Sequence, residues 1–187
     1  MQDVYKICPQ FENEQYLLRL VSKGDCLDLL KVYSDKKAVP FFNSDNCNGD
    51  DFHYTTEKRM QEAINFWIFS YNERYFVRWS IIDKLKDEAI GTIELFHRDS
   101  ADYMDNCGLL RLDIRSDYEQ TNHIENILSL IIEPAYELFY CDKIATKAIV
   151  NAEERVTALE QLGFKMIDEK LLGHDNIEYI DYWVLTQ

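Results

Sequence analysis

Two residues of one short segment could carry acid–base chemistry. Glu94 lies in the middle of the alternating stretch 88–96, and its neighbours Ile93 and Leu95 should point to the opposite side. A carboxylate there could act, directly or through a water molecule, as the base that deprotonates an amine. His97 follows the same stretch and could share that role, because its side chain titrates near neutral pH. The alternatives are an ion-paired or solvated strand carboxylate and a surface histidine.

A second candidate site combines aromatic rings with carboxylates. The acidic segment 43–51 is flanked by Phe41, Phe42, Phe52 and Tyr54. Aromatic walls with carboxylates nearby suit a cationic amine, through cation–π contacts and charge pairing. The alternative is ordinary packing of a loop. Neither the spacing of a calcium loop nor that of a zinc site is present, so we expect no metal.

Charge and composition narrow the classes of partner. The 187 residues include 20 Lys and Arg against 34 Asp and Glu, a net charge of −14. Such a charge repels phosphate backbones and anionic membrane surfaces, so we expect neither nucleic-acid nor membrane binding. The chain is 47% hydrophobic, which is enough for a core. Without a linker-like stretch, we expect residues 1–187 to form a single domain.

The cysteines and the N-terminus indicate the compartment. The five cysteines form no C-x-x-C pair. The first residues lack the basic start and apolar stretch of a secretory signal. No apolar run reaches the ~18 residues of a membrane span. We therefore expect reduced thiols and a cytoplasmic protein.

Hydrophobic periodicity predicts the elements that position these side chains. Alternation predicts strands near 16–21, 76–83, 88–96, 108–114, 143–150, 164–169 and 177–185. A period of 3.6 residues predicts helices after Asp25, after Thr56, from about Asn122 and over 153–162. Pro134 should end or kink the third helix at about Glu133. The order β-α-α-β-β-β-α-β-α-β-β predicts an α+β fold, with a mixed, mostly antiparallel central sheet and helices on both faces.

Four of these segments resemble the GNAT superfamily of N-acetyltransferases, in particular the branch that acetylates ribosomal-protein N-termini. They are YLLRLV at 16–21, AIGTIELF at 89–96, RSDY at 115–118 and LEQLGFK at 159–165. The last is the most specific, because a helix closing on Leu-Gly-Phe before a strand is frequent in that family. The resemblance covers most of the chain. It implies a GNAT-like fold and transfer of an acetyl group from acetyl-CoA to a small-molecule or peptide amine.

The resemblance also implies where acetyl-CoA would bind. In the family, two central strands splay apart to pair with pantetheine, and the N–H groups opening the next helix hold the pyrophosphate. A backbone N–H near Leu112–Ile114 would polarise the thioester. The cofactor-binding residues implied in this chain are Leu112, Ile114, Arg115, Gln120, Thr121, Asn122, His123 and Ile124. His123 could contact a phosphate or only cover the helix end.

The helix opening departs from the family pattern [Arg/Gln]-x-x-Gly-x-[Gly/Ala]. Glu119, Asn122 and Ile124 stand at its three defining positions. Asn122-x-x-Glu125 has the form of a capping box, whose side chains would occupy the N–H groups that a pyrophosphate needs. Leu159 stands where many active members have the Tyr that protonates the departing thiolate.

Three functions stay open on this sequence. The first is an acetyl-CoA-dependent N-acetyltransferase with an unknown acceptor, and the second is a catalytically silent GNAT-fold protein that acts as a binding or interaction module. The third is an enzyme whose acyl donor has no pyrophosphate. Tyr- and Trp-rich segments near the C-terminus also make a homodimer possible.

Overall fold

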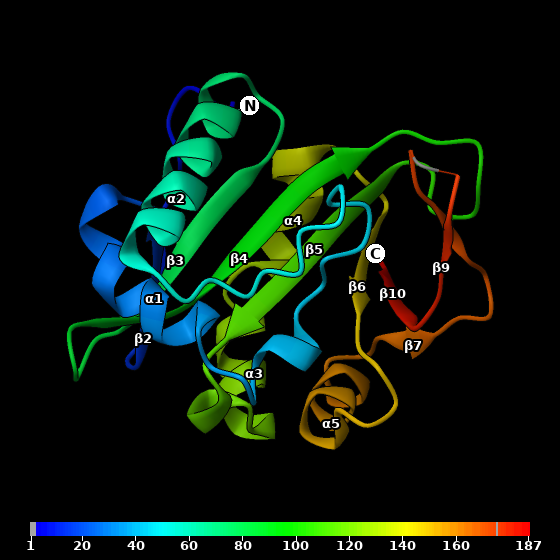
Figure 1. Ribbon diagram of the computed structural model, residues 1–187. Coiled ribbons are helices and arrows are strands. Elements are labelled where there is room, and N and C mark those ends of the chain that lie inside the picture. Colours follow the sequence, from blue (N-terminus) through cyan, green and yellow to red (C-terminus); the bar gives the residue numbers. More distant parts are fainter. Residues whose placement is uncertain (1–2, 175) are drawn as a thin grey trace.

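A central sheet runs through the protein, of which the computed structural model describes residues 3–174 and 176–187 (Figure 1). Its strands are β1 (Phe11–Glu12), β2 (Tyr16–Leu20), β3 (Val77–Asp83), β4 (Glu88–Arg98), β5 (Cys107–Ile114), β6 (Lys143–Lys147), β7 (Lys165–Met166) and β10 (Tyr182–Thr186). They lie in the order β1-β2-β3-β4-β5-β6-β10-β7. Neighbours are antiparallel except β5 and β6, which are parallel. The sheet is therefore mixed and largely antiparallel, as predicted.

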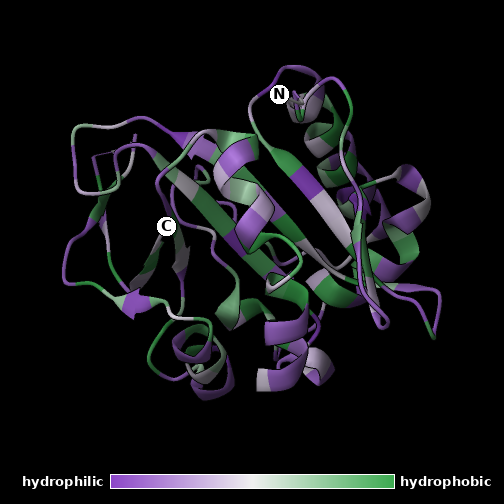
Figure 2. Cartoon of the chain, turned by 180° about the vertical axis from the view of Figure 1, so that it is seen from behind, coloured by the Kyte–Doolittle hydropathy of each residue, from purple (hydrophilic) through white to green (hydrophobic). Residues whose placement is uncertain are grey.

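Helices cover both faces of the sheet. They are α1 (Cys26–Tyr33), α2 (Glu57–Asn72), α3 (Thr121–Leu128), α4 (Ile132–Phe139) and α5 (Glu153–Gln161). On one face α1 contacts β4 and α2 contacts β3, and on the other α4 contacts β5 and β6 (Figures 1 and 2). A separate two-stranded ribbon joins β8 (Leu171–Leu172) to β9 (Glu178–Tyr179). This arrangement confirms the predicted α+β class.

Alternation along the strands divides their side chains among three hydrophobic clusters, of which two are the main cores. On β3, Val77, Trp79 and Ile81 belong to the larger core, which the side chains of α3 and α4 complete. A smaller core lies under α1 and α2 and includes Ile64 and Trp67 of α2. Intervening strand positions carry polar residues, and they point to the face of α1 and α2.

The long helix expected to begin near Asn122 is divided into two helices. α3 ends at Leu128 and α4 begins at Ile132, so the break precedes the predicted one at Glu133. Pro134 lies in the first turn of α4, where its missing N–H costs no hydrogen bond. Pro134 therefore lies at the start of α4, whereas we expected it to end the helix that begins near Asn122. In the described parts of the chain, no helix is both long and apolar enough to cross a membrane.

Candidate functional site

A row of charged side chains crosses three adjacent strands. The strand register places Arg78 of β3 opposite Glu94 of β4, and Glu94 opposite Arg111 of β5. Arg78 donates to Glu94 Oε2 through Nε, at 3.2 Å, and also through Nη2. Arg111 Nη1 donates to Glu94 Oε1 at 2.7 Å. All three residues are buried, so both oxygens of this carboxylate are ion-paired away from solvent.

A fourth charged residue, Asp113 of β5, lies behind Arg78. Its Oδ2 accepts hydrogen bonds from Arg78 Nη1 at 3.1 Å and from the Tyr33 hydroxyl at 2.8 Å. Arg78 Nη1 also donates to Thr92 Oγ1 at 3.0 Å. Burial raises the pKa of Asp113. The network is buried, and hydrogen bonds between its members replace water at most of its polar atoms; Arg111 Nε and Asp113 Oδ1 have no partner among the described residues.

This environment speaks against Glu94 as a general base. Burial alone would raise the pKa of Glu94, but the charges of Arg78 and Arg111 outweigh burial and lower it. A carboxylate with a lowered pKa holds a proton weakly, and its oxygens already accept bonds from both guanidinium groups. Glu94 is therefore better described as the centre of an ion-pair row.

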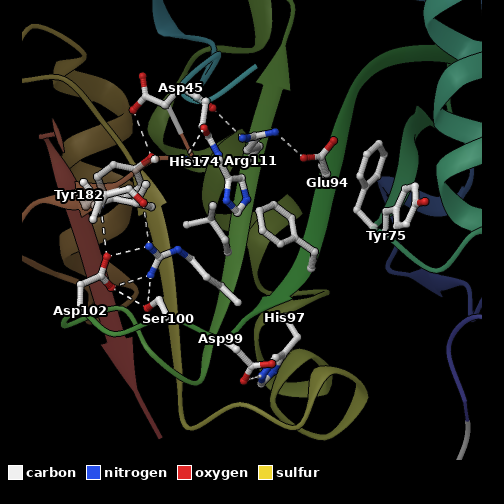
Figure 3. A pocket seen from close by; sticks show the side chains of 18 of the residues that line it. Asp45, Tyr75, Glu94, His97, Asp99, Ser100, Asp102, Arg111, His174 and Tyr182 are labelled. Atoms are coloured by element: carbon white, nitrogen blue, oxygen red, sulfur yellow. Dashed lines mark hydrogen bonds and ion pairs between the residues drawn. The ribbon is translucent and has the colours of Figure 1, made fainter. Parts of the chain in front are cut away.

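Two cavities meet at this row. The large cavity has a volume of about 840 Å³ and the smaller one about 380 Å³. Asn46, Phe76, Glu94 and Arg111 line both of them. Figure 3 shows the large cavity, with Arg111 pointing across it toward Glu94. Both openings therefore lead to the same buried charges.

His97 lines the large cavity but lies apart from Glu94 (Figure 3). Its Nδ1 is 2.6 Å from the carbonyl oxygen of Phe139, and its Nε2 is 2.9 Å from Asp99 Oδ1. Both ring nitrogens are thus engaged within the protein. The structure brings the two predicted acid–base residues to one cavity without bringing them together.

The smaller cavity holds only part of the predicted aromatic site. Phe52 and Tyr54 line it, together with Trp67 of α2. Phe42 is buried instead against Tyr33, with 5.3 Å between the ring centroids. Phe41, in the short turn η2 (Val39–Phe41), lies outside both cavities. Two of the four aromatic residues therefore reach the cavity.

Guanidinium groups of the protein itself cover these aromatic rings. Arg59 Cζ lies 4.3 Å from the ring centroid of Tyr54, and Arg78 Cζ lies 4.3 Å from that of Trp67. Because Arg59, Arg78 and Arg111 line this smaller cavity, we call it the arginine cavity. The cations expected on these rings are the side chains of the protein, which disfavours the cationic ligand that the sequence predicted.

The acidic segment 43–51 is fixed over β5 and β6 by Asp45. Its carboxylate accepts hydrogen bonds from Lys147 Nζ, at 2.7 and 2.8 Å, and from the Tyr182 hydroxyl at 3.1 Å. Its carbonyl oxygen accepts a bond from Arg111 Nη2 at 2.9 Å. This segment therefore supplies part of the lining of both cavities, together with residues of the sheet (Figure 3).

Solved structures match this fold over nearly its whole length, although no protein-family model and no curated protein matches the sequence. A GNAT-family acetyltransferase from Bacillus anthracis aligns with a TM-score of 0.69 at 10% identity, covering 95% of this chain and 98% of that one. The ribosomal-protein-S5-alanine acetyltransferase of Vibrio fischeri aligns with a TM-score of 0.69 at 16% identity, covering 96% of each chain. The chain has the GNAT fold. Spermidine N-acetyltransferase from Vibrio cholerae, solved with CoA and spermine, aligns with a TM-score of 0.66 at 15% identity. The alignment covers 94% of this chain and 97% of that one.

Arg155 of α5 binds the part of β5 where the family resemblance predicts that pantetheine would pair. The pairing of β5 with β6 reaches Leu110, and beyond it Arg155 Nη1 donates to the carbonyl oxygen of Leu112 at 2.9 Å. The same nitrogen donates to the carbonyl of Phe41, also at 2.9 Å. Nε and Nη2 each donate to Glu119 at 2.7 Å. The Arg155 and Glu119 side chains are only 3% and 7% exposed.

An exposed carboxylate of the protein occupies one backbone N–H of the helix opening next to it. Glu154 Oε2 accepts a bond from the Thr121 backbone N–H at 2.8 Å and from its hydroxyl at 2.5 Å. α3 begins at Thr121, after Gln120 as N-cap, and no side chain of its own caps it. The predicted capping box of Asn122 and Glu125 is therefore wrong: the helix begins before Asn122, and the capping carboxylate comes from α5.

Three more of the implied cofactor residues, Arg115, His123 and Ile124, are also engaged within the protein. Arg115 pairs with Glu88 and Asp117. His123 Nδ1 lies 2.5 Å from the Tyr16 hydroxyl, and Ile124 is buried in the larger core. The residues present fit a CoA pyrophosphate and pantetheine poorly, because Glu154 takes the Thr121 N–H at the helix opening and Arg155 takes the Leu112 carbonyl of the strand.

The sequence reasoning missed Arg78, Arg111 and Asp113 as members of a site. A signal was present, because all three occupy the polar positions of alternating strands. The register that brings Arg78 and Arg111 to opposite sides of Glu94 is set by the sheet. Their burial depends on α1, α2 and the segment 43–55, which are distant in the sequence.

Proposed function

We propose that this protein is a binding protein with the GNAT fold and no acetyltransferase activity, because its own side chains fill the acyl-donor groove. The single observation that carries the proposal is the placement of Arg155. One guanidinium group binds Glu119, the carbonyl of Leu112 and the carbonyl of Phe41. It thereby joins the helix-opening segment to the strand edge that pantetheine would use.

Opening this groove would be costly. A cofactor that displaced Arg155 would separate two buried charges, and breaking such a pair costs about 3–5 kcal/mol. At about 1.4 kcal/mol per tenfold change, affinity would fall by roughly two to four orders of magnitude. Glu154 adds a negative charge beside the N–H groups that a pyrophosphate would need.

The two cavities support a binding role. They lie on the face of β4 and β5 that α2 and the segment 43–51 border, separate from the filled groove. Their volumes lie within the range of about 300–1,000 Å³ that is usual for small-molecule sites. Binding there does not require Arg155 or Glu154 to move.

Thiol release from acetyl-CoA tests the proposal directly. We expect no release above the uncatalysed rate with spermine or with N-terminal peptides as acceptors. Acceptor-dependent release by the purified protein would refute the proposal and support the second candidate, an acyl-CoA-dependent N-acetyltransferase, which the fold alone favours.

A pair of double variants tests the physical reason. Glu119→Gln with Arg155→Ser empties the groove of its ion pair, so we expect acetyl-CoA to bind this variant more tightly than the parent protein. Arg19→Ser with Asp25→Asn removes a partly exposed ion pair between β2 and the N-cap of α1, which shares no hydrogen bond with Arg155 or Glu119. We expect no gain from it. Equal affinities in all three proteins would show that the ion pair is not what excludes CoA.

A further inference from the structure

The arginine cavity has the wrong charge for an amine. We propose that it binds an organic anion, a carboxylate carried on an aromatic or other apolar body. This assignment rests on the proposed function, because it names the class of ligand that the binding protein takes. It also replaces the cationic ligand that the aromatic residues and acidic segment had predicted.

The charges lining the cavity leave an excess of one positive charge. Three guanidinium groups, those of Arg59, Arg78 and Arg111, face two carboxylates, those of Asp50 and Glu94. The excess is notable in a chain whose net charge is −14. Asp113 lies behind Arg78 and does not line the cavity. An anion therefore complements the cavity better than a cation does.

Both carboxylates are already used by the protein. Asp50 accepts hydrogen bonds from Arg59, from the Tyr54 hydroxyl at 3.1 Å and from the Phe52 backbone N–H at 2.9 Å. Both oxygens of Glu94 accept bonds from guanidinium groups, as described above. An ammonium group entering the cavity would compete with arginines for each of them.

Guanidinium donors, in contrast, remain for a ligand. Arg111 is only 8% exposed, yet its Nε–H has no hydrogen-bond partner among the residues that the structure describes. Arg59 commits Nη2 to Asp50, and its side chain is 41% exposed. A buried N–H without a partner is unfavourable. Because the Arg111 Nε–H lies below the surface, the donors directly available to a carboxylate are those of the partly exposed Arg59.

The walls of the cavity define the rest of the ligand. Phe52, Trp67 and Phe76 supply apolar surface within a volume of about 380 Å³, which suits a single ring or a short chain. Phe66 borders the same cavity and is 57% exposed, in edge-to-face contact with Phe76 at 6.2 Å between centroids. An exposed aromatic at a cavity mouth is a typical feature of a binding site.

Three probes that share one aromatic body and differ in charge test the assignment. Phenylacetate, phenylacetamide and phenethylamine are titrated separately into the full chain by calorimetry at pH 7, without acetyl-CoA. We expect phenylacetate to bind at least tenfold more tightly than the amide, and the amine to bind most weakly. Equal binding of all three, tighter binding of the amine, or no binding of phenylacetate up to 10 mM would overturn the proposal.

Two single variants test whether phenylacetate binds in the arginine cavity. Arg59→Gln removes a partly exposed donor, so we expect phenylacetate to bind about tenfold more weakly. Lys31→Gln removes one exposed positive charge outside both cavities, and we expect no change. An equal loss in both variants would mean that only net charge matters and would refute the site. These titrations contain no acyl donor, so their failure would leave the test of acetyl transfer unaffected.

Discussion

Replacing Arg155 by Met should destabilise the protein far more than an ordinary surface change. The substitution keeps an apolar stem but removes two hydrogen bonds to Glu119 and those to the carbonyls of Leu112 and Phe41. It leaves the Glu119 carboxylate, only 7% exposed, without its partner. Removing one member of a buried ion pair costs about 3–5 kcal/mol. For a chain of this size, that predicts a fall in Tm of roughly 6–20 °C.

The assay is urea unfolding followed by circular dichroism, with the free energy of unfolding extrapolated to water. Adding Glu119→Gln to Arg155→Met removes the orphaned charge, so the double variant should recover much of the loss. The coupling between the two changes should exceed about 2 kcal/mol. Lys170→Met is the control, because its pair with Glu178 is exposed and should contribute no more than about 1 kcal/mol.

A cost below about 1 kcal/mol for Arg155→Met would refute this reasoning. So would effects of the two substitutions that simply add. Either result would mean that Arg155 and Glu119 do not form a buried pair in solution and that the groove is open to ligands.

Three further predictions concern stability. Gly91→Ala should cost at least about 1–3 kcal/mol in urea unfolding, because an added Cβ would lie 2.3 Å from the carbonyl oxygen of Asp113; a neutral result would contradict the close approach of β4 and β5. Bonds from Arg19 and Ser80 outweigh burial and lower the pKa of Asp25, so its stabilising contribution is complete above about pH 4 and is lost below it. The stability deficit of Asp25→Asn should therefore shrink as pH falls below about 4, and a constant deficit would contradict this. Burial raises the pKa of Asp113, so its ionisation costs stability as pH rises above about 4. Asp113→Asn should therefore gain stability relative to the parent over that rise, and a difference that does not change with pH would contradict the raised pKa.

Much of the fold could be predicted because it depends on local patterns. Alternation located the long strands, and the 3.6-residue period located α2, whose N-cap Thr56 accepts a hydrogen bond from the Arg59 N–H as such a cap should. The break in the helix expected from Asn122 was predicted too late, at about Glu133, whereas α3 ends at Leu128 and α4 begins at Ile132. The apolar stripe continues across the break, and Pro134 fits the start of a helix as well as its end.

The candidate site was less predictable because its contacts are not local. The pairing of Arg155 with Glu119 joins α5 to the segment before α3, two elements that meet only when the chain is folded. Periodicity identifies Glu94 as a polar position in a strand. It does not show that arginines of both neighbouring strands hold its two oxygens. Side chains that are distant in sequence determine what the groove and the cavities can bind.

Isothermal titration of the purified protein with acetyl-CoA, and separately with CoA, tests the central claim most directly. The filled groove predicts no heat of binding from either ligand up to millimolar concentration. Micromolar binding of either would contradict the account, because Arg155 and Glu154 would then have to yield the backbone atoms that they occupy.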